Sequence, residues 1–288
     1  MNGLSLIQRE DKAKHMILTI DIGGTNIKAG FCDYDGIFLY KKIYKTPSSC
    51  EELIQSILNL DYDYEGIAIS IPGILNEDKS SVHTTGKLKY LSDYPIQKVL
   101  ENEKQCKVTL ENDARCATLA EVGFGNLKNS TNGLVVTIGT YLGMGLVIQN
   151  DLYSGSHGLA GEYGDALFLN HKKMAYTFGK EGLEEYVGYS GVELFQKLKD
   201  PGIFEKFDAY CTDLAKMLCN IQLLLDLDTI LIGGGISSNP ILIERIEKHM
   251  QDLKSNFTTM HMPSIQSCKY YNDANLLGAL YVYKKRDH

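Results

Sequence analysis

The sequence predicts an α/β protein made of two related domains that flank a cleft. The first observation is that short apolar runs alternate, along the 288 residues, with segments whose apolar residues recur at helical spacing. This alternation is typical of α/β folds. The second is an internal repeat, because residues 17–36 and 133–155 share a layout of apolar strand, small polar turn, second strand and closing turn. Two copies of one unit favour two domains of the same kind.

The first half of the chain opens with a hairpin. The apolar runs on either side of Gly23-Gly24-Thr25 have strand character, and Asp35-Gly36 is a hairpin-turn signal. A third strand follows, then a helix with apolar residues three and four apart, a continuous apolar strand that ends in Pro-Gly, a short helix and another strand. We predict these five elements at residues 39–43, 50–60, 66–75, 95–103 and 107–110.

The second half repeats this pattern. A helix begins near Asn112-Asp113, and the second hairpin is followed by two helices, a strand that runs into three glycines, a helix with Pro240 in its first turn, and a final helix. These last five elements are predicted at residues 182–198, 204–225, 228–237, 239–251 and 274–285.

The domain boundaries follow from this order of elements. We expect residues 1–15 to be a leader. The smaller domain is expected at residues 16–112, with residues 274–288 returning to it, and the larger domain at residues 113–273.

Composition excludes several classes of protein. The formal net charge of −7 argues against nucleic acid as the main partner. No apolar run approaches the roughly 18 residues that span a bilayer, and the N-terminal region has no signal-peptide core. The seven cysteines are dispersed and form no C-x-x-C pair, which fits a reducing cytoplasm better than a disulfide framework or zinc ribbon. We therefore expect a cytoplasmic protein with small-molecule partners.

Three glycine-rich turns follow apolar strands, and they begin at Gly23, Gly139 and Gly233. Backbone amides in such turns bind phosphate oxygens because no Cβ blocks the approach. None of the three is a Walker loop or a G-x-G-x-x-G motif. Asp21 interrupts a buried strand just before the first turn, and a buried carboxylate needs a partner or a cation. The combination favours a nucleotide site.

The chain contains, in this order, the segments DIGGTNIKAG, IPGIL, ENDARCATLAE, TIGTYLGMGLV, HGLAGEYGD and LIGGGIS. Together they resemble the ROK family of bacterial sugar kinases and repressors. The first segment is similar to the phosphate loop of the wider superfamily of sugar kinases, Hsp70 and actin. The resemblance covers roughly residues 16–285 and implies two ribonuclease H-like domains of the actin-like ATPase fold.

This resemblance implies catalytic and sugar-binding residues. Asp113 occupies the position of the general base, which must reach the attacking hydroxyl, and the helix that it opens favours a carboxylate. Sugar contacts are implied for Gly73, Asn112, Asp113, His157, Glu162 and Glu184. Glu185 is an equal alternative to Glu184. From the residues alone, Asn112-Asp113 could instead form a helix N-cap, and His157 could be an ordinary loop histidine.

The resemblance also implies ATP and Mg²⁺ as cofactors. In the superfamily the aspartate lies beside the Mg²⁺ shell, mainly through water, while loop amides and threonines hold phosphate oxygens. Asp21 is the implied Mg²⁺ residue. The implied ATP and phosphate contacts are Asp21, Gly23, Gly24, Thr25, Lys28, Gly139, Thr140, Gly233, Gly234 and Gly235.

The chain departs from the family pattern in three places. The usual E-x-G-H is EYGD at residues 162–165, and Phe178 and Leu183 stand where zinc-binding thiolates are usual. Because zinc needs about four nitrogen or sulfur ligands, we expect no structural zinc, and apolar packing in its place. Tyr141 stands where many relatives have glycine. With Asp165, it leaves the identity of the sugar and the catalytic strength open.

The leading hypothesis is an ATP-dependent sugar kinase that transfers the γ-phosphoryl group to a hydroxyl, often the 6-OH, of a hexose, an amino sugar or a β-glucoside. The missing zinc pattern favours β-glucosides or N-acetylmannosamine. The alternative is a catalytically weak sugar-sensing regulator. A DNA-binding repressor is disfavoured, because the roughly 15 residues before the first strand hold no helix-turn-helix pattern. The resemblance also implies a homodimer.

Overall fold

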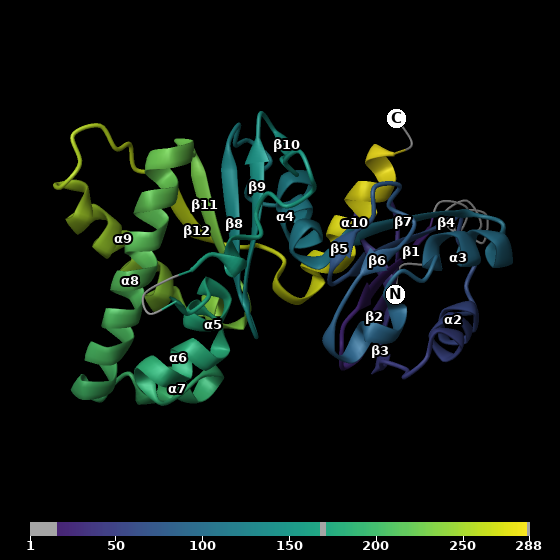
Figure 1. The fold of residues 1–288 in the computed structure, drawn as a ribbon, viewed down its shortest axis with the longest axis horizontal. Helices are drawn as coiled ribbons and strands as arrows, with labels where there is room; N and C mark the ends of the chain where they lie inside the picture. Colours follow the sequence, from purple (N-terminus) through teal and green to yellow (C-terminus); the bar gives the residue numbers. More distant parts are fainter. Residues whose placement is uncertain (1–15, 168–170, 287–288) are drawn as a thin grey trace, which may run out of the picture. The chain divides into compact units, whose positions relative to one another are not determined.

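The computed structural model describes residues 16–167 and 171–286 (Figure 1). The predicted leader at residues 1–15 therefore lies outside the described residues. Contacts divide the chain into two units. Unit 1 runs to Phe124 and resumes at Asp273, and unit 2 is Gly125–Asn272.

The division falls after Phe124 rather than at residue 112. Its physical reason is helix α4 (Asp113–Gly123), which packs against the last helix, α10 (Ala274–Lys285), inside unit 1. The two helices approach closely at Gly278, where an added Cβ would lie 1.7 Å from the carbonyl oxygen of Cys116. Helix α4 therefore belongs to unit 1 and not to the larger domain that the sequence indicated.

Unit 1 contains a five-stranded sheet in the order β3-β2-β1-β4-β7. Strand β2 is antiparallel to both β1 and β3, whereas β4 and β7 run parallel to β1. The elements besides α4 and α10 are β1 (Ile17–Ile22), β2 (Asn26–Cys32), β3 (Phe38–Lys45), α2 (Cys50–Leu58), β4 (Gly66–Ile71), β5 (Ile74–Leu75), β6 (Val82–His83), η1 (Gly86–Leu91), α3 (Ile96–Lys104) and β7 (Lys107–Asn112).

Both faces of this sheet are covered by helices. Leu18 and Ile20 of β1 share a core with residues of α2 and α3, whereas Ile17 packs with Leu280 of α10 and with α4. Because successive side chains of a strand point to opposite faces, Asp21 projects from the same face as Ile17. Strand β1 therefore carries a carboxylate, one residue before its end, on the side of α4 and α10.

Unit 2 repeats the topology of unit 1. Its sheet has the order β10-β9-β8-β11-β12, in which β8, β9 and β10 are antiparallel neighbours and β11 and β12 run parallel to β8. The two sheets match strand for strand. The predicted internal repeat and the predicted α/β fold with two ribonuclease H-like units are therefore confirmed.

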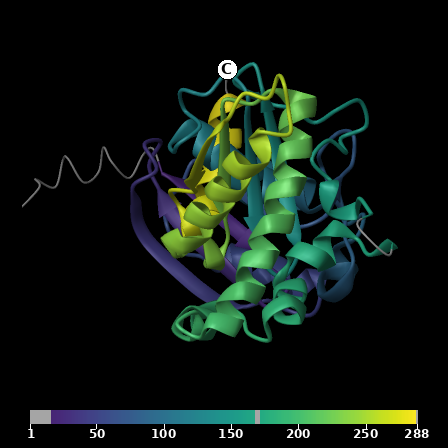
Figure 2. The ribbon, with the colours of Figure 1, turned by 90° about the vertical axis from the view of Figure 1, so that its left-hand side faces the viewer.

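The elements of unit 2 are β8 (Gly133–Ile138), β9 (Leu142–Ile148), β10 (Asp151–Leu152), η2 (Tyr163–Asp165), α5 (Met174–Phe178), α6 (Lys180–Val187), α7 (Gly191–Lys197), α8 (Pro201–Leu225), β11 (Thr229–Gly233), η4 (Gly235–Ser238), α9 (Pro240–Lys254) and β12 (Ser264–Ser267). The turn η5 (Tyr271–Asp273) leads into α10. Helices α8 and α9 pack side by side over one face of the sheet (Figure 2).

The segment predicted as one helix at residues 182–198 forms two helices. Helix α6 ends at Gly188, which has a left-handed φ of +85°, and α7 begins after it. Phe178 and Leu183, at the positions where the family often has thiolates, are buried in the core of unit 2. Apolar packing therefore fixes this segment, as the sequence predicted.

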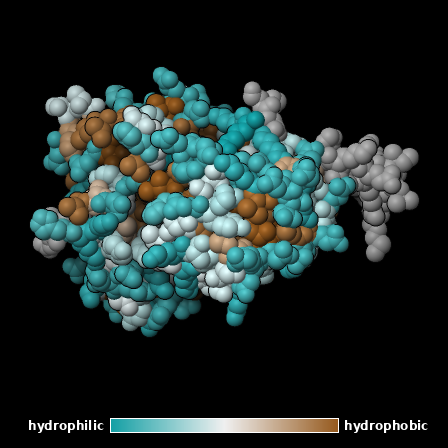
Figure 3. Space-filling model, turned by 45° about the vertical axis from the view of Figure 1, so that its right-hand side comes forward, coloured by the Kyte–Doolittle hydropathy of each residue, from teal (hydrophilic) through white to brown (hydrophobic). Residues whose placement is uncertain are grey.

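Within the described residues, no helix is long and apolar enough to cross a membrane. Figure 3 shows a face that is mostly hydrophilic, with hydrophobic residues in separate patches. Leu39 and Ile43 are exposed on the edge strand β3. Lysines at positions 41, 42 and 45 lie on the same strand, and such charges oppose pairing of an edge strand with another chain.

Candidate functional site

The carboxyl ends of three parallel strands of unit 1 bring predicted site residues to one edge of the sheet. In the register of the strands, Asp21 pairs with Ser70 of β4, and Ile71 pairs with Asn112 of β7. Ligands of open α/β sheets bind at this edge. The sequence-predicted residues Asp21, Gly73 and Asn112 are therefore neighbours in the sheet of unit 1.

Asp21 is buried and surrounded by donors. Its Oδ1 accepts hydrogen bonds from the Ser70 hydroxyl at 3.3 Å and from the Asn275 amide of α10 at 3.0 Å. Its Oδ2 lies 3.5 Å from the ammonium of Lys28. These partners allow a carboxylate to end a buried strand. Lys28, predicted as a phosphate contact, is thus an ion-pair partner of Asp21.

Sequence reasoning did not predict Ser70 and Asn275 as partners of Asp21. The position of Ser70 could have been inferred, because its hydroxyl ends the apolar run GIAIS, at the strand end where ligands of α/β sheets bind. The contact of Asn275 could not, since this residue lies 254 positions from Asp21 in the sequence.

The turn between β1 and β2 exposes two backbone amides. The Gly23 N–H donates to the carbonyl of Asn26 at 3.1 Å, and the Thr46 N–H donates to the carbonyl of Thr25 at 3.1 Å. No described residue accepts from the N–H groups of Gly24 and Thr25, and both residues are exposed. The turn therefore uses the Gly23 amide for its own hydrogen bond. The amides of Gly24 and Thr25 remain available to donate to a phosphate oxygen.

Asn112 has a structural role at the start of α4. Its Oδ1 accepts from the Arg115 N–H at 3.1 Å, and its Nδ2 donates to the carbonyl of Gly73 at 2.9 Å. The N-cap interpretation is therefore correct for Asn112. The second Nδ2 proton of Asn112 remains for the predicted hydrogen bond to a sugar hydroxyl.

Gly73 has a φ of +120°, and an added Cβ there would lie 2.4 Å from the carbonyl of His83, so the turn requires glycine.

Asp113 is the first residue of α4 and is half-buried. Its Oδ1 accepts from the Ala114 N–H at 2.8 Å, which holds the carboxylate at the positive end of the helix dipole. Burial raises the pKa of the nearby Cys116 thiol well above its ordinary value. A protonated thiol is a poor nucleophile and base, which leaves the Asp113 carboxylate as the better-suited proton acceptor.

A buried ionic cluster fixes the junction between β7 and α4. Glu111 is 3% exposed. Its carboxylate lies 3.2 Å from the Lys79 ammonium, 3.8 Å from the Arg115 guanidinium and 4.0 Å from that of Arg286. This cluster lies directly before Asn112 and Asp113 in the chain.

The corresponding turn of unit 2 follows β8. The Gly139 N–H donates to the carbonyl of Tyr141 at 3.1 Å, and the Gly139 carbonyl accepts from the Lys180 N–H at 2.9 Å. Thr140 and Tyr141 are exposed. The Tyr141 ring meets the Tyr176 ring edge-to-face, with centroids 5.4 Å apart. Thr140 is thus exposed, with an aromatic pair beside it, and its role as a phosphate contact stays a prediction.

The third glycine turn follows β11. Gly234 has a φ of +91°, and an added Cβ would lie 2.1 Å from the carbonyl of Ile138 at the end of β8. An added Cβ at Gly233 would lie 3.0 Å from the sulfur of Cys268. Gly235 faces open space. The first two glycines are therefore required by packing, and only Gly235 has room for a ligand beside its Cα.

The predicted sugar glutamates lie on unit 2. Glu162 is exposed, in the segment that packs against β9, since an added Cβ at Gly164 would lie 2.6 Å from the carbonyl of Leu142. Glu184 is half-buried and accepts from the Ser190 hydroxyl. Glu185 is exposed and pairs with a lysine.

The remaining residues of this region are exposed. His157 lies in the loop between β10 and η2, and its side chain is exposed. Asp165 stands at the position of the family histidine, and its carboxylate lies 2.7 Å from the ammonium of Lys173. Within residues 16–167 and 171–286, no group of three or more His, Cys, Asp or Glu residues could hold a metal ion. The prediction that structural zinc is absent stays a prediction.

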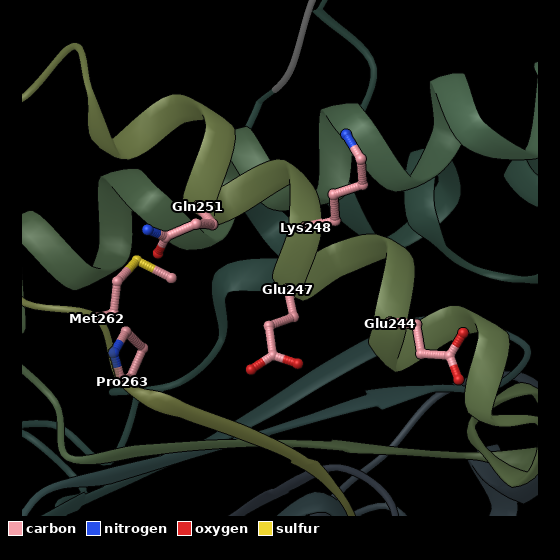
Figure 4. A pocket seen from close by; sticks show the side chains of 6 residues that line it. All are labelled: Glu244, Glu247, Lys248, Gln251, Met262 and Pro263. Atoms are coloured by element: carbon pink, nitrogen blue, oxygen red, sulfur yellow. The ribbon is translucent and has the colours of Figure 1, made fainter.

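A surface hollow on unit 2 holds none of the predicted residues. It lies between helix α9 and the segment before β12, and Figure 4 shows its lining of Glu244, Glu247, Lys248, Gln251, Met262 and Pro263. The glutamate side chains extend from the helix without converging on one point.

The fold and the turns define a class of protein. Two ribonuclease H-like units that each place a glycine-containing turn between their first two strands constitute the actin-like ATPase fold. Within that class, the model of the ROK family matches residues 17–286. The chain belongs to the ROK family.

Named relatives of the chain are sugar kinases. The chain is 29% identical to a β-glucoside kinase of Listeria monocytogenes, over 94% of the chain and 98% of the relative. It is 29% identical to an N-acetylmannosamine kinase of Haemophilus influenzae, over 93% and 95%. A solved ROK family protein from Streptococcus pneumoniae, in complex with sucrose, is 32% identical with a TM-score of 0.86, over 94% of the chain and 99% of that protein.

Proposed function

We propose that the chain is an ATP-dependent sugar kinase that transfers the γ-phosphoryl group of ATP to a hydroxyl, the 6-OH, of a hexose, an amino sugar or a β-glucoside. The observation that carries the proposal is the carboxyl edge of the unit 1 sheet. There the buried carboxylate of Asp21 lies near the end of β1, a turn with two available amides follows β1, and the helix-opening carboxylate of Asp113 follows β7. Both strands pair in parallel with β4. Phosphoryl transfer needs donors that bind the phosphate oxygens, a carboxylate that holds the metal ion and a base that accepts the proton of the attacking hydroxyl.

In the proposed reaction, Asp113 accepts the proton of the attacking sugar hydroxyl. The oxygen of that hydroxyl forms a bond to the γ-phosphorus, and the bond from this phosphorus to the bridging oxygen breaks. The electron pair of the broken bond stays on the β-phosphate of ADP. A sugar phosphate, ADP and one proton on Asp113 result, so atoms and charges balance.

The proposed nucleotide contacts come from the three glycine turns. Gly24 and Thr25 of unit 1 would donate amides, Thr140 would act in unit 2, and Gly235 would lie beside the adenosine. Asp21 fits Mg²⁺, because that ion keeps several waters and needs only one or two carboxylates. When bound, Mg²⁺ would neutralise charge on the transferring phosphoryl group.

The names of the relatives support two classes of acceptor sugar. They are β-glucosides and N-acetylmannosamine, which the departures from the zinc pattern also favoured. Glu162 and one of the glutamates at positions 184 and 185 would accept hydrogen bonds from sugar hydroxyls. Carboxylates suit vicinal diols because each oxygen accepts two hydrogen bonds.

A panel of sugars tests the proposal. Sugar-dependent ADP release is measured with glucose, cellobiose and N-acetylmannosamine, for the wild type and for Asp113→Asn. We expect one sugar to stimulate release and Asp113→Asn to lower kcat by about 100-fold or more. If sugars bind by calorimetry but none stimulates release, the chain is instead the sugar-sensing regulator.

Two further parts of the proposal have their own measurements. Glu184→Gln and Glu185→Gln form a matched pair. Both carboxylates have a lysine partner, but the Glu184 side chain is 43% exposed and accepts from the Ser190 hydroxyl, whereas that of Glu185 is 67% exposed. We therefore expect only Glu184→Gln to weaken sugar binding. We also propose a cytoplasmic homodimer. Sedimentation velocity at micromolar concentration gives the mass in solution, and a monomer there contradicts the dimer.

A further inference from the structure

The 3₁₀ helix η1 brings a lysine onto the first phosphate turn. The Lys87 ammonium donates a hydrogen bond to the Thr25 hydroxyl at 3.2 Å. Its methylene chain also lies along the turn, since a Cβ added at Gly24 would be 3.6 Å from the Cβ of Lys87. A positive charge thus lies beside the two amides that have no protein acceptor.

The backbone under Lys87 is fixed by packing. Leu88 and Leu91 of η1 are buried in the core of unit 1. The Tyr90 hydroxyl donates to the carbonyl of Pro47 at 2.7 Å, and the thiol of Cys50 donates to the carbonyl of Tyr90 at 3.0 Å. The lysine therefore extends from a rigid support, which lowers the entropy lost when it binds an anion.

Lys87 differs from the other lysines around this edge of the sheet. Lys28 lies 3.5 Å from the Asp21 carboxylate, and Lys79 lies 3.2 Å from that of Glu111. No carboxylate of residues 16–167 or 171–286 lies within ion-pair distance of Lys87. Among the described residues, the Lys87 ammonium donates to the neutral hydroxyl of Thr25, which leaves its full charge for an anion.

We infer that Lys87 binds the γ-phosphoryl group of the nucleotide in the first phosphate turn and stabilises it during transfer. This inference rests on the proposed kinase function and adds a residue that the family motifs do not contain. In this role Lys87 donates hydrogen bonds to phosphoryl oxygens while the bond to ADP breaks and the bond to the sugar forms. Such fixed cations act where charge develops in the transition state.

Binding of two nucleotides tests the γ-phosphoryl contact without turnover. Dissociation constants of AMPPNP and ADP with Mg²⁺ are measured by calorimetry for the wild type, Lys87→Met and Lys89→Met. Lys89 is exposed on the same 3₁₀ helix and gives a control with the same change of net charge. We expect Lys87→Met to weaken AMPPNP about 10-fold or more and ADP less than twofold, with Lys89→Met unchanged for both.

Steady-state kinetics with the preferred sugar provide the second readout. We expect Lys87→Met to lower kcat by about 100-fold with the KM of the sugar unchanged, and Lys87→Arg to recover part of that loss. Equal weakening of ADP and AMPPNP, equal effects of Lys89→Met, or a change confined to the sugar KM overturns the inference. A wild type that releases no ADP with any sugar contradicts the kinase proposal instead, while the nucleotide comparison still decides whether Lys87 contacts the γ-phosphate.

Discussion

The side-chain amide of Asn275, on the last helix, donates a hydrogen bond to Oδ1 of Asp21, on the first strand, over 3.0 Å. The Asp21 carboxylate is buried, so loss of a donor leaves part of its charge without compensation. Asn275→Ala is therefore expected to lower the free energy of unfolding by about 1.5–3 kcal/mol, as for a hydrogen bond to a charged group.

Urea denaturation measures this change, and Asn102→Ala is the control because Asn102 is exposed on α3. We also expect Asn275→Ala to raise the KM of ATP, since Asp21 is the proposed Mg²⁺ residue. Equal stability of the two alanine variants would show that the hydrogen bond contributes nothing.

Two neighbouring glycines form a matched test of the third turn. Gly234→Ala places a Cβ 2.1 Å from the carbonyl of Ile138 at a φ of +91°, whereas Gly235→Ala meets open space. We expect Gly234→Ala to destabilise unit 2 by more than about 3 kcal/mol, and Gly235→Ala by less than about 1 kcal/mol. Thermal melts followed by circular dichroism compare the two, and similar melting temperatures would contradict the packing described for this turn.

The buried carboxylate of Glu111 predicts an asymmetry between the partners of its ionic cluster. Glu111→Gln removes the negative charge that Glu111 supplies to Arg115 and Arg286, which is expected to cost about 3–5 kcal/mol. Lys79→Met removes a side chain that is 42% exposed and is expected to cost less than about 1 kcal/mol. Chemical denaturation of both variants is the measurement. A larger loss for Lys79→Met than for Glu111→Gln would be inconsistent with this cluster.

Acid is expected to weaken the contact between α8 and α9 through Asp208. Burial opposes ionisation of Asp208, but hydrogen bonds from Arg245 and His249 outweigh it, and the pKa of Asp208 lies below its ordinary value. A lowered pKa in the folded state adds stability above the pKa of the unfolded chain, about 3.9, and this stability is lost as the pH falls through the folded-state pKa.

The free energy of unfolding of the wild type should therefore fall further between pH 6 and pH 3 than that of Asp208→Asn. Urea titrations at the two pH values give this difference. Parallel losses in the two proteins would show that Asp208 does not couple the helices to pH.

The features that could be predicted from the sequence are those that a short stretch of residues specifies by itself. The two hairpins repeat a strong alternation of apolar residues around small polar turns, so the shared topology followed from them. Strand β12 was missed because its four residues include one buried apolar side chain, Ile265. The break between α6 and α7 was missed because Gly188 is isolated in a helical pattern, and its left-handed conformation has no other local signal.

The candidate site was predictable where one segment holds several of its residues. Asn112, Asp113 and the three glycine turns each follow an apolar strand, so their placement at strand ends could be inferred. The contacts of Lys87 and Asn275 could not, because each joins residues that are far apart in the chain. Such pairs depend on the packing of η1 and α10, which no pattern within either segment specifies.

The return of α10 to unit 1 has a consequence for biosynthesis. Unit 2 is one continuous stretch of chain, whereas unit 1 lacks α10 until all of unit 2 has been translated. Until α10 emerges from the ribosome, the nascent first sheet has an uncovered apolar face that includes Ile17 and Ala68, and such transient surfaces bind chaperones or aggregate. Unit 2, although it is translated after most of unit 1, can therefore finish folding before unit 1 does.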